Sequence, residues 1–124
     1  MKYEEDPRFC GYYFEDSYVL SVNVGFSQAV FDLDAVLTPQ HPHYAAPLPD
    51  EFHCYRRAQL WFKDAFDISY DPSGAPPAWD ANDDWDHGNI DSFEIDPPHG
   101  YHLAGGWGQL KLKALNAFVK DSGQ

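Results

Sequence analysis

The chain has 124 residues and a net charge of −12, and it combines 17% aromatic residues with ten prolines and nine glycines. This length predicts a single domain over residues 1–124, built around one hydrophobic core. The negative charge disfavours nucleic acids and anionic membranes as partners, because both repel an acidic protein. The mixture of aromatic residues, proline and glycine favours strands and structured loops over long helices.

Targeting signals and paired cysteines are not evident. The first residues, MKYEEDPRF, lack the basic and apolar regions of a signal peptide, and no run of about 18 apolar residues occurs. We therefore expect a cytoplasmic protein. In such a chain Cys10 and Cys54 are more often reduced thiols than a disulfide, and neither belongs to a CxxC motif that would hold zinc.

Alternation of apolar and polar residues predicts an antiparallel hairpin between residues 17 and 37. The first arm, SYVLSVNV, is expected to turn Tyr18, Leu20, Val22 and Val24 toward the core. A short connection at Gly25 joins it to the second arm, as in a hairpin. The second arm is expected to bury Ala29, Phe31, Leu33, Ala35 and Leu37.

Further strands are predicted in the second half of the chain. HCYRRAQLWF alternates with Cys54, Ala58, Leu60 and Phe62 on one face, AFDISY continues this strand, and SFEID forms a short one. The C-terminal part predicts a hairpin that turns at GGWG and whose second arm buries Leu110, Leu112 and Ala114. A helix over residues 110–120 is the alternative. The fold class is therefore all-β, an antiparallel sandwich or open barrel of six or seven short strands with at most one short helix.

The acidic residues concentrate in one segment. Residues 71–96 contain eight acidic residues and no Lys or Arg, and two tryptophans lie among them. Aromatic anchors surrounded by carboxylates are typical of a protein interface that recognises a basic surface. We therefore expect a non-enzymatic protein that binds a basic partner protein. The predicted contact residues are Trp79, Asp80, Asp83, Asp84, Trp85 and Asp86.

A calcium site is the first alternative for the same segment. In DANDDWDHGNID, oxygen-bearing side chains fall at alternate positions, as in a calcium loop; they are Asp80, Asn82, Asp84, Asp86 and Asp91. Trp85 occupies the sixth position, where an EF-hand has glycine, and the last ligand is Asp in place of Glu. An irregular calcium site and an acidic loop without any ion both stay open.

Enzymatic motifs are absent from the sequence. GxSxG, GxxxxGK and HExxH do not occur, and we expect no catalytic residue, metal or cofactor. His41 and His43 resemble half of a zinc site, but no spacing identifies a third ligand. Arg56 shares a strand face with apolar residues, so it needs a carboxylate partner, for which Glu15, Asp16, Asp32 and Asp34 are candidates. Alternatively, Arg56 and the histidines line a pocket for a small anionic ligand.

Three short motifs carry a family resemblance. EDSYVL at residues 15–20, CYRR at 54–57 and WGQLKL at 107–112 resemble small bacterial β-domains of unknown function whose first strand begins in the same way. The resemblance implies an all-β fold and transfers no catalytic residue. In size and charge the chain is also similar to immunity proteins, which neutralise secreted toxins.

Overall fold

The computed structural model describes residues 1–47, 49, 53–74, 78–79 and 85–121, and of residues 78, 79 and 85 it describes the backbone alone. One short 3₁₀ helix, η1 (Tyr3–Glu5), precedes the strands. The strands are β1 (Tyr12–Val24), β2 (Gln28–Leu37), β3 (Cys54–Pro72), β4 (Ala78–Trp79), β5 (Trp85–Asp86), β6 (Ile90–Asp96), β7 (Gly100–Gly105) and β8 (Gly108–Asp121).

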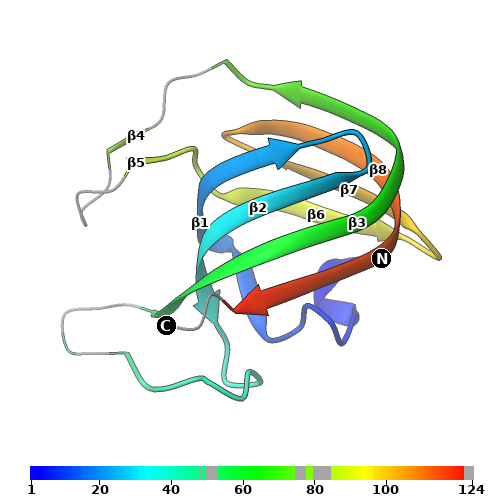
Figure 1. The fold of residues 1–124 in the computed structure, drawn as a ribbon. Helices are drawn as coiled ribbons and strands as arrows, with labels where there is room; N and C mark the ends of the chain where they lie inside the picture. The colour runs from blue at the N-terminus through cyan, green and yellow to red at the C-terminus, as the bar shows by residue number, and fades with distance from the viewer. Residues whose placement is uncertain (48, 50–52, 75–77, 80–84, 122–124) are drawn as a thin grey trace.

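Six antiparallel strands form one curled sheet in the order β1-β2-β3-β8-β7-β6 (Figure 1). The sheet wraps around the core as a half-barrel, which confirms the all-β prediction and favours the open barrel over the sandwich. β4 and β5 form a separate two-stranded ribbon beside it. Three strands of the sheet have 13, 19 and 14 residues, so they are longer than expected.

The alternation in β2 and β8 is confirmed. The predicted inward residues of β2 are all at most 3% exposed, and those of β8 at most 2%. Gly105 pairs with Gly108 across the predicted GGWG turn, where Gly108 has a φ of +132° that favours glycine. The helix over residues 110–120 does not form. Residues 108–121 are a strand in which buried and exposed residues alternate up to Leu115, and the buried face then shifts by one residue to Ala117 and Val119.

The inward face predicted for β1 is wrong at its centre. Val19 is fully buried, whereas Tyr18 and Leu20 are half-buried. The register between β1 and β2 shifts between Tyr13 and Tyr18 and again between Val19 and Ser21. Each extra residue in a β-bulge turns the following side chains to the opposite face of the strand. Past the second shift, Val22 and Val24 pack against the core as expected.

β3 bends sharply in its second half and passes over the upper end of the half-barrel (Figure 1). Asp64 and Asp67 have a φ of 52°, and the register with β8 shifts between Phe66 and Ser69. Aspartate is among the residues that adopt this left-handed conformation most readily. Ala65 N–H donates to Ser27 O at 2.8 Å, so the bend is tied to the turn between β1 and β2.

The N-terminal segment closes the other side of the core, which the alternation did not predict. Tyr3 and Phe9 are buried, and the Tyr3 ring lies 4.9 Å from Phe14 and 5.5 Å from Phe93. Arg8 fixes this segment, because its guanidinium pairs with Asp6 at 2.7 Å and donates to Tyr101 Oη at 3.1 Å and Ala117 O at 3.3 Å. The guanidinium lowers the pKa of the Asp6 carboxyl through these hydrogen bonds.

Cys10 and Cys54 are free thiols, as expected.

Candidate functional site

The described part of the predicted acidic surface is a ribbon. Trp79 of β4 lies directly opposite Trp85 of β5 in its register. The predicted contact residues Asp80, Asp83 and Asp84 lie outside the described residues. Asp86 is 5% exposed, and its Oδ1 accepts a hydrogen bond from Gly88 N–H at 2.8 Å. The Asp86 carboxylate therefore holds the turn that follows β5.

The base of the ribbon is attached to β1. Val19 exchanges two backbone hydrogen bonds of 2.8 Å with this segment: its N–H donates to Gly88 O, and its carbonyl accepts from His87 N–H. Asn89 adds a side-chain hydrogen bond of 2.9 Å to Ser17 O. These bonds fix the ribbon beside the first strand of the sheet, where Figure 1 shows β4 and β5 standing away from the half-barrel.

The structure describes only some of the residues that the calcium hypothesis names. Asp80, Asn82 and Asp84 lie outside the described residues, while Asp86 already serves the Gly88 amide. Among the described residues, no group of three or more His, Cys, Asp or Glu side chains is placed to hold a metal ion. Calcium binding stays a prediction, and a melting curve recorded with and without calcium tests it.

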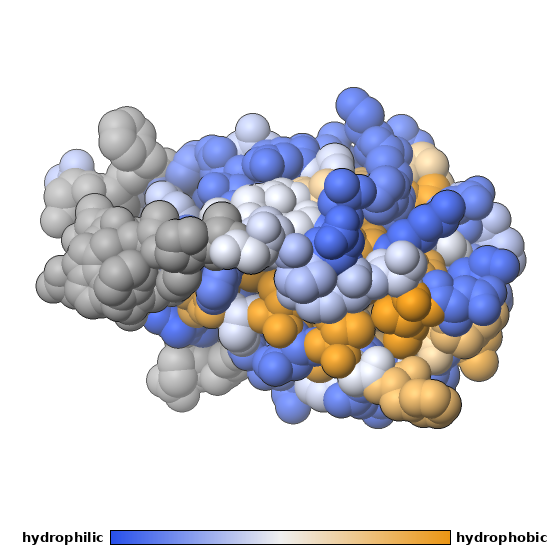
Figure 2. All heavy atoms as spheres, turned by 90° about the horizontal axis from the view of Figure 1, so that it is seen from above, coloured by the Kyte–Doolittle hydropathy of each residue, from blue (hydrophilic) through white to orange (hydrophobic). Residues whose placement is uncertain are grey.

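The end of the half-barrel next to the β1–β2 turn carries exposed aromatic side chains. Phe26, at the tip of this turn, is 100% exposed, and Phe66, on the bend of β3, is 44% exposed. Both line a hollow of about 570 Å³, which we call the hairpin hollow. Its lining residues are Val24, Gly25, Phe26, Ser27, Ala65, Phe66, Asp67, Ile68 and Tyr70. Figure 2 views the molecule from above and shows apolar side chains at the surface among polar ones.

A second hollow connects this end to the ribbon. It has a volume of about 280 Å³, and Tyr70 lines both hollows. The Tyr70 ring lies 6.4 Å from the buried ring of Trp107, whose Nε1 has no hydrogen-bond partner among the described residues. His87, which follows β5 directly, also lines this hollow. A concave surface of mixed polarity therefore continues from the hairpin hollow to the base of the acidic ribbon.

The sequence contains a signal for this surface in the turn between the first two strands. Phe26 lies in the turn GFS between two alternating strands, where no strand neighbour can cover it. A large apolar residue at the tip of a hairpin is expected to be exposed. Phe66 gives no comparable signal, because its exposure depends on the bend of β3.

The predicted histidine and arginine residues gather at the opposite end of the sheet. His43 N–H donates to His41 Nδ1 at 3.0 Å, so the remaining nitrogen, Nε2, carries the proton of the neutral ring and donates to Tyr12 Oη at 2.9 Å. Tyr12 in turn donates to Asp121 Oδ1 at 3.4 Å. Burial lowers the pKa of His41 and raises that of Tyr12.

Arg56 forms the ion pair that its position in the strand required. Its Nε lies 3.3 Å from Asp121 Oδ2, without the geometry of a hydrogen bond. The partner is the last residue of β8 and is none of the four acidic residues expected. This difference arises because β3 and β8 are neighbours in the sheet, which brings the end of β8 beside the start of β3. Asp121 also lies 3.9 Å from His43, so the cluster is internally paired.

Comparison with protein family models, with curated proteins and with solved structures finds no match for this chain. The resemblance of the EDSYVL strand to bacterial β-domains therefore stays a prediction. Among the described residues, no helix is long and apolar enough to cross a membrane.

Proposed function

We propose that this protein binds a basic partner protein through the hairpin hollow and the neighbouring acidic ribbon. The observation that carries the proposal is the full exposure of Phe26 beside an apolar hollow. A fully exposed phenylalanine gains no free energy of burial in the isolated protein. It gains this free energy when a partner covers the side chain. Contiguous exposed apolar surface of this kind marks interaction sites in soluble proteins.

The charge of the chain selects the kind of partner. Eight acidic residues and no basic ones lie between residues 71 and 96, and the whole chain carries −12. A field of this sign accelerates the encounter with a basic surface and slows the encounter with an acidic one. The two kinds of side chain therefore contribute differently to binding: the carboxylates of the segment set the association rate, and the aromatic side chains slow dissociation.

The ribbon extends the proposed contact surface. Trp79 and Trp85 lie opposite each other in it, and tryptophans are among the residues that contribute most to binding at interfaces. A small acidic protein that covers a basic partner in this way fits the inhibitor or immunity class. The partner would then be a basic protein whose activity the complex blocks.

A capture experiment with matched variants tests the proposal. Three immobilised proteins are compared: the wild type, the double variant Phe26→Ser/Phe66→Ser, and the control Leu115→Ser. Leu115 is 57% exposed on β8 and lies outside the hairpin hollow, so its loss removes exposed apolar surface elsewhere. We expect a basic protein to be retained from a host lysate by the wild type and the control, and not by the double variant.

Kinetics with the captured protein then separate the two contributions. Loss of both phenylalanines should weaken affinity about 100-fold, mostly through faster dissociation, as expected for truncation of two central interface residues. Replacing Asp80, Asp83 and Asp84 with Asn should slow association about tenfold at low salt and leave dissociation unchanged. Retention of the same proteins by all three matrices, or of acidic proteins alone, would overturn the proposal.

A further inference from the structure

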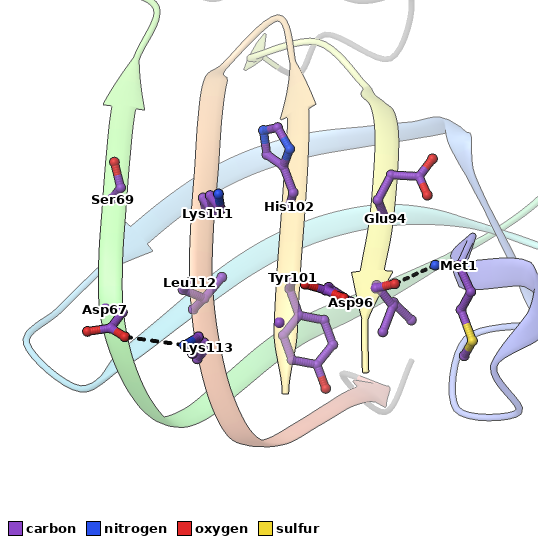
Figure 3. A pocket seen from close by; sticks show the side chains of 12 residues that line it. Met1, Asp67, Ser69, Glu94, Asp96, Tyr101, His102, Lys111, Leu112 and Lys113 are labelled. Carbon is purple, nitrogen blue, oxygen red and sulfur yellow. Dashed lines mark hydrogen bonds and ion pairs between the residues drawn. The ribbon is translucent and has the colours of Figure 1, made fainter. Parts of the chain in front are cut away.

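The outer face of the sheet carries a groove that the proposed partner surface does not use. It lies across β3, β8, β7 and β6 and has a volume of about 460 Å³, within the range of small-ligand sites (Figure 3). The lining residues are Met1, Asp67, Ser69, Glu94, Ile95, Asp96, Gly100, Tyr101, His102, Lys111, Leu112 and Lys113.

Most side-chain charges of the groove are segregated by strand; the exceptions are Asp67 of β3, which pairs with Lys113, and the N-terminal ammonium of Met1, which donates to Ile95 O of β6. β6 contributes Glu94 and Asp96, and β8 contributes Lys111 and Lys113. β7 lies between them and separates the acidic side from the basic side. Figure 3 shows this arrangement, with His102 standing between Glu94 and Lys111. The groove is therefore dipolar across its width.

The register explains why these opposite charges do not neutralise each other. Glu94 pairs with His102, and His102 pairs with Lys111. Neighbouring strands lie about 4.8 Å apart, so the backbones of Glu94 and Lys111 are separated by roughly 10 Å. Among the described residues, neither side chain has a hydrogen-bond or ion-pair partner, whereas Lys113 pairs with Asp67 at 3.6 Å. The Glu94 carboxylate and the Lys111 ammonium thus face the groove unpaired.

Because the groove carries both acidic and basic side chains, it does not suit a polyanion or a bare cation. A polyanion such as a nucleotide would meet Glu94, Asp96 and Asp67 together with the lysines. A bare cation would meet Lys111 and Lys113. A ligand with a positive end toward β6 and a negative end toward β8 satisfies both sides, and the Ser69 hydroxyl beside Lys111 offers a further donor to the negative end.

We propose that this groove binds a short zwitterionic ligand, of the amino acid or short peptide class. Its amino group lies at Glu94 and Asp96, and its carboxylate lies at Lys111 and Ser69. An extended chain spans at most about 3.5 Å per residue, so one to three residues bridge the two sides. The site is independent of the hairpin hollow, since the two share only Asp67.

Titration of the full chain with triglycine, followed by amide resonances, tests the proposal. We expect shifts at Gly100, His102 and Lys111 with a dissociation constant on the order of 1 mM. Triglycine blocked by acetyl and amide groups at its two ends should cause none of these shifts, because it lacks both charges.

Variants locate the two charged contacts. Lys111→Gln and Glu94→Gln should each weaken binding about threefold to fivefold, as the loss of one partly exposed ion pair predicts. Lys120→Gln removes an exposed lysine of β8 outside the groove and should leave binding unchanged. Absence of triglycine shifts in the groove, equal shifts with the blocked peptide, or wild-type affinity in both groove variants would each overturn the proposal.

Discussion

Tyr18 of β1 pairs with Asn89, the residue before β6, and this bridge joins the two edge strands of the sheet. Edge strands expose unpaired backbone groups that promote association with other chains. Here Val19 is satisfied by His87 and Gly88 on one edge, and Ile95 exchanges hydrogen bonds with Met1 on the other. The two edge strands of the half-barrel, β1 and β6, are thus partly covered by short segments at residues 87–89 and at Met1. We call the line where β1 and β6 meet the seam.

Replacing Asn89 with Ala should weaken this seam. Its side chain donates to the carbonyl of Ser17, a residue that is 0% exposed, so the variant leaves a buried acceptor without a partner. We expect a loss of about 1–3 kcal/mol in the free energy of unfolding by urea, together with faster hydrogen exchange at the amides of Val19 and His87. Asn116→Ala, which removes an exposed hydrogen bond to Asp64, should cost about 0.5 kcal/mol or less. Equal losses in the two variants would contradict this account.

The N-terminal segment should contribute as much to stability as a strand of the sheet. Phe9 is fully buried, with its ring 5.1 Å from Phe93 and 6.4 Å from Phe14. Phe9→Ala should therefore lower the free energy of unfolding by about 3–5 kcal/mol. Phe26→Ala provides the matched control, because the same side chain is removed from full exposure and the change should stay within about 0.5 kcal/mol. A small effect of Phe9→Ala would show that this segment only lies on the core.

Sequence patterns predicted the inward residues where the period of two holds. In β2 and in the first half of β8 all residues predicted to point inward are buried, so the position of these residues in the strand determined their burial. β1 departs from this rule because two register shifts turn its centre, and a bulge is a property of the ladder that a single strand does not reveal. A register shift also explains why the exposure of Phe66 was not predicted, because this exposure follows from the bend of β3.

Neither the packing of the N-terminal segment on the core nor the groove across β3, β8, β7 and β6 could be predicted from local patterns. Arg8 contacts Tyr101, 93 residues away, and this contact depends on the completed sheet. The groove likewise requires β6, β7 and β8 in register before Glu94 and Lys111 flank His102. Local patterns did predict the acidic segment between residues 71 and 96, because charge composition does not depend on the fold.

Trp61 and Phe118 should stabilise each other across β3 and β8. They are direct neighbours in the register, and their rings stack with centroids 6.2 Å apart and planes inclined by 6°. A double-mutant cycle with both residues changed to Ala should give a coupling energy of about 0.5–1.5 kcal/mol in urea unfolding. Additive losses would show that the two rings contribute only by covering the sheet.

His41 should make stability depend on pH below neutrality. The ring is neutral in the structure, because Nδ1 accepts from His43 N–H while Nε2 faces Tyr12 Oη. Burial lowers the pKa of His41 below its unfolded value of about 6.5, and Asp121, His43 and Arg56 surround it. A proton on Nδ1 would also break the hydrogen bond from His43.

The direction of the effect follows from proton linkage. Above a pH of about 6.5 both states hold the ring neutral, and the contribution of His41 is fully present. As the pH falls below that value, the unfolded chain takes up the proton first, so the folded state loses stability. Urea unfolding between neutral and mildly acidic pH should therefore show a weaker pH dependence in His41→Gln than in the wild type. His102→Gln, which changes an exposed histidine of β7, should retain the wild-type dependence, and an unchanged slope in His41→Gln would show that other groups cause it.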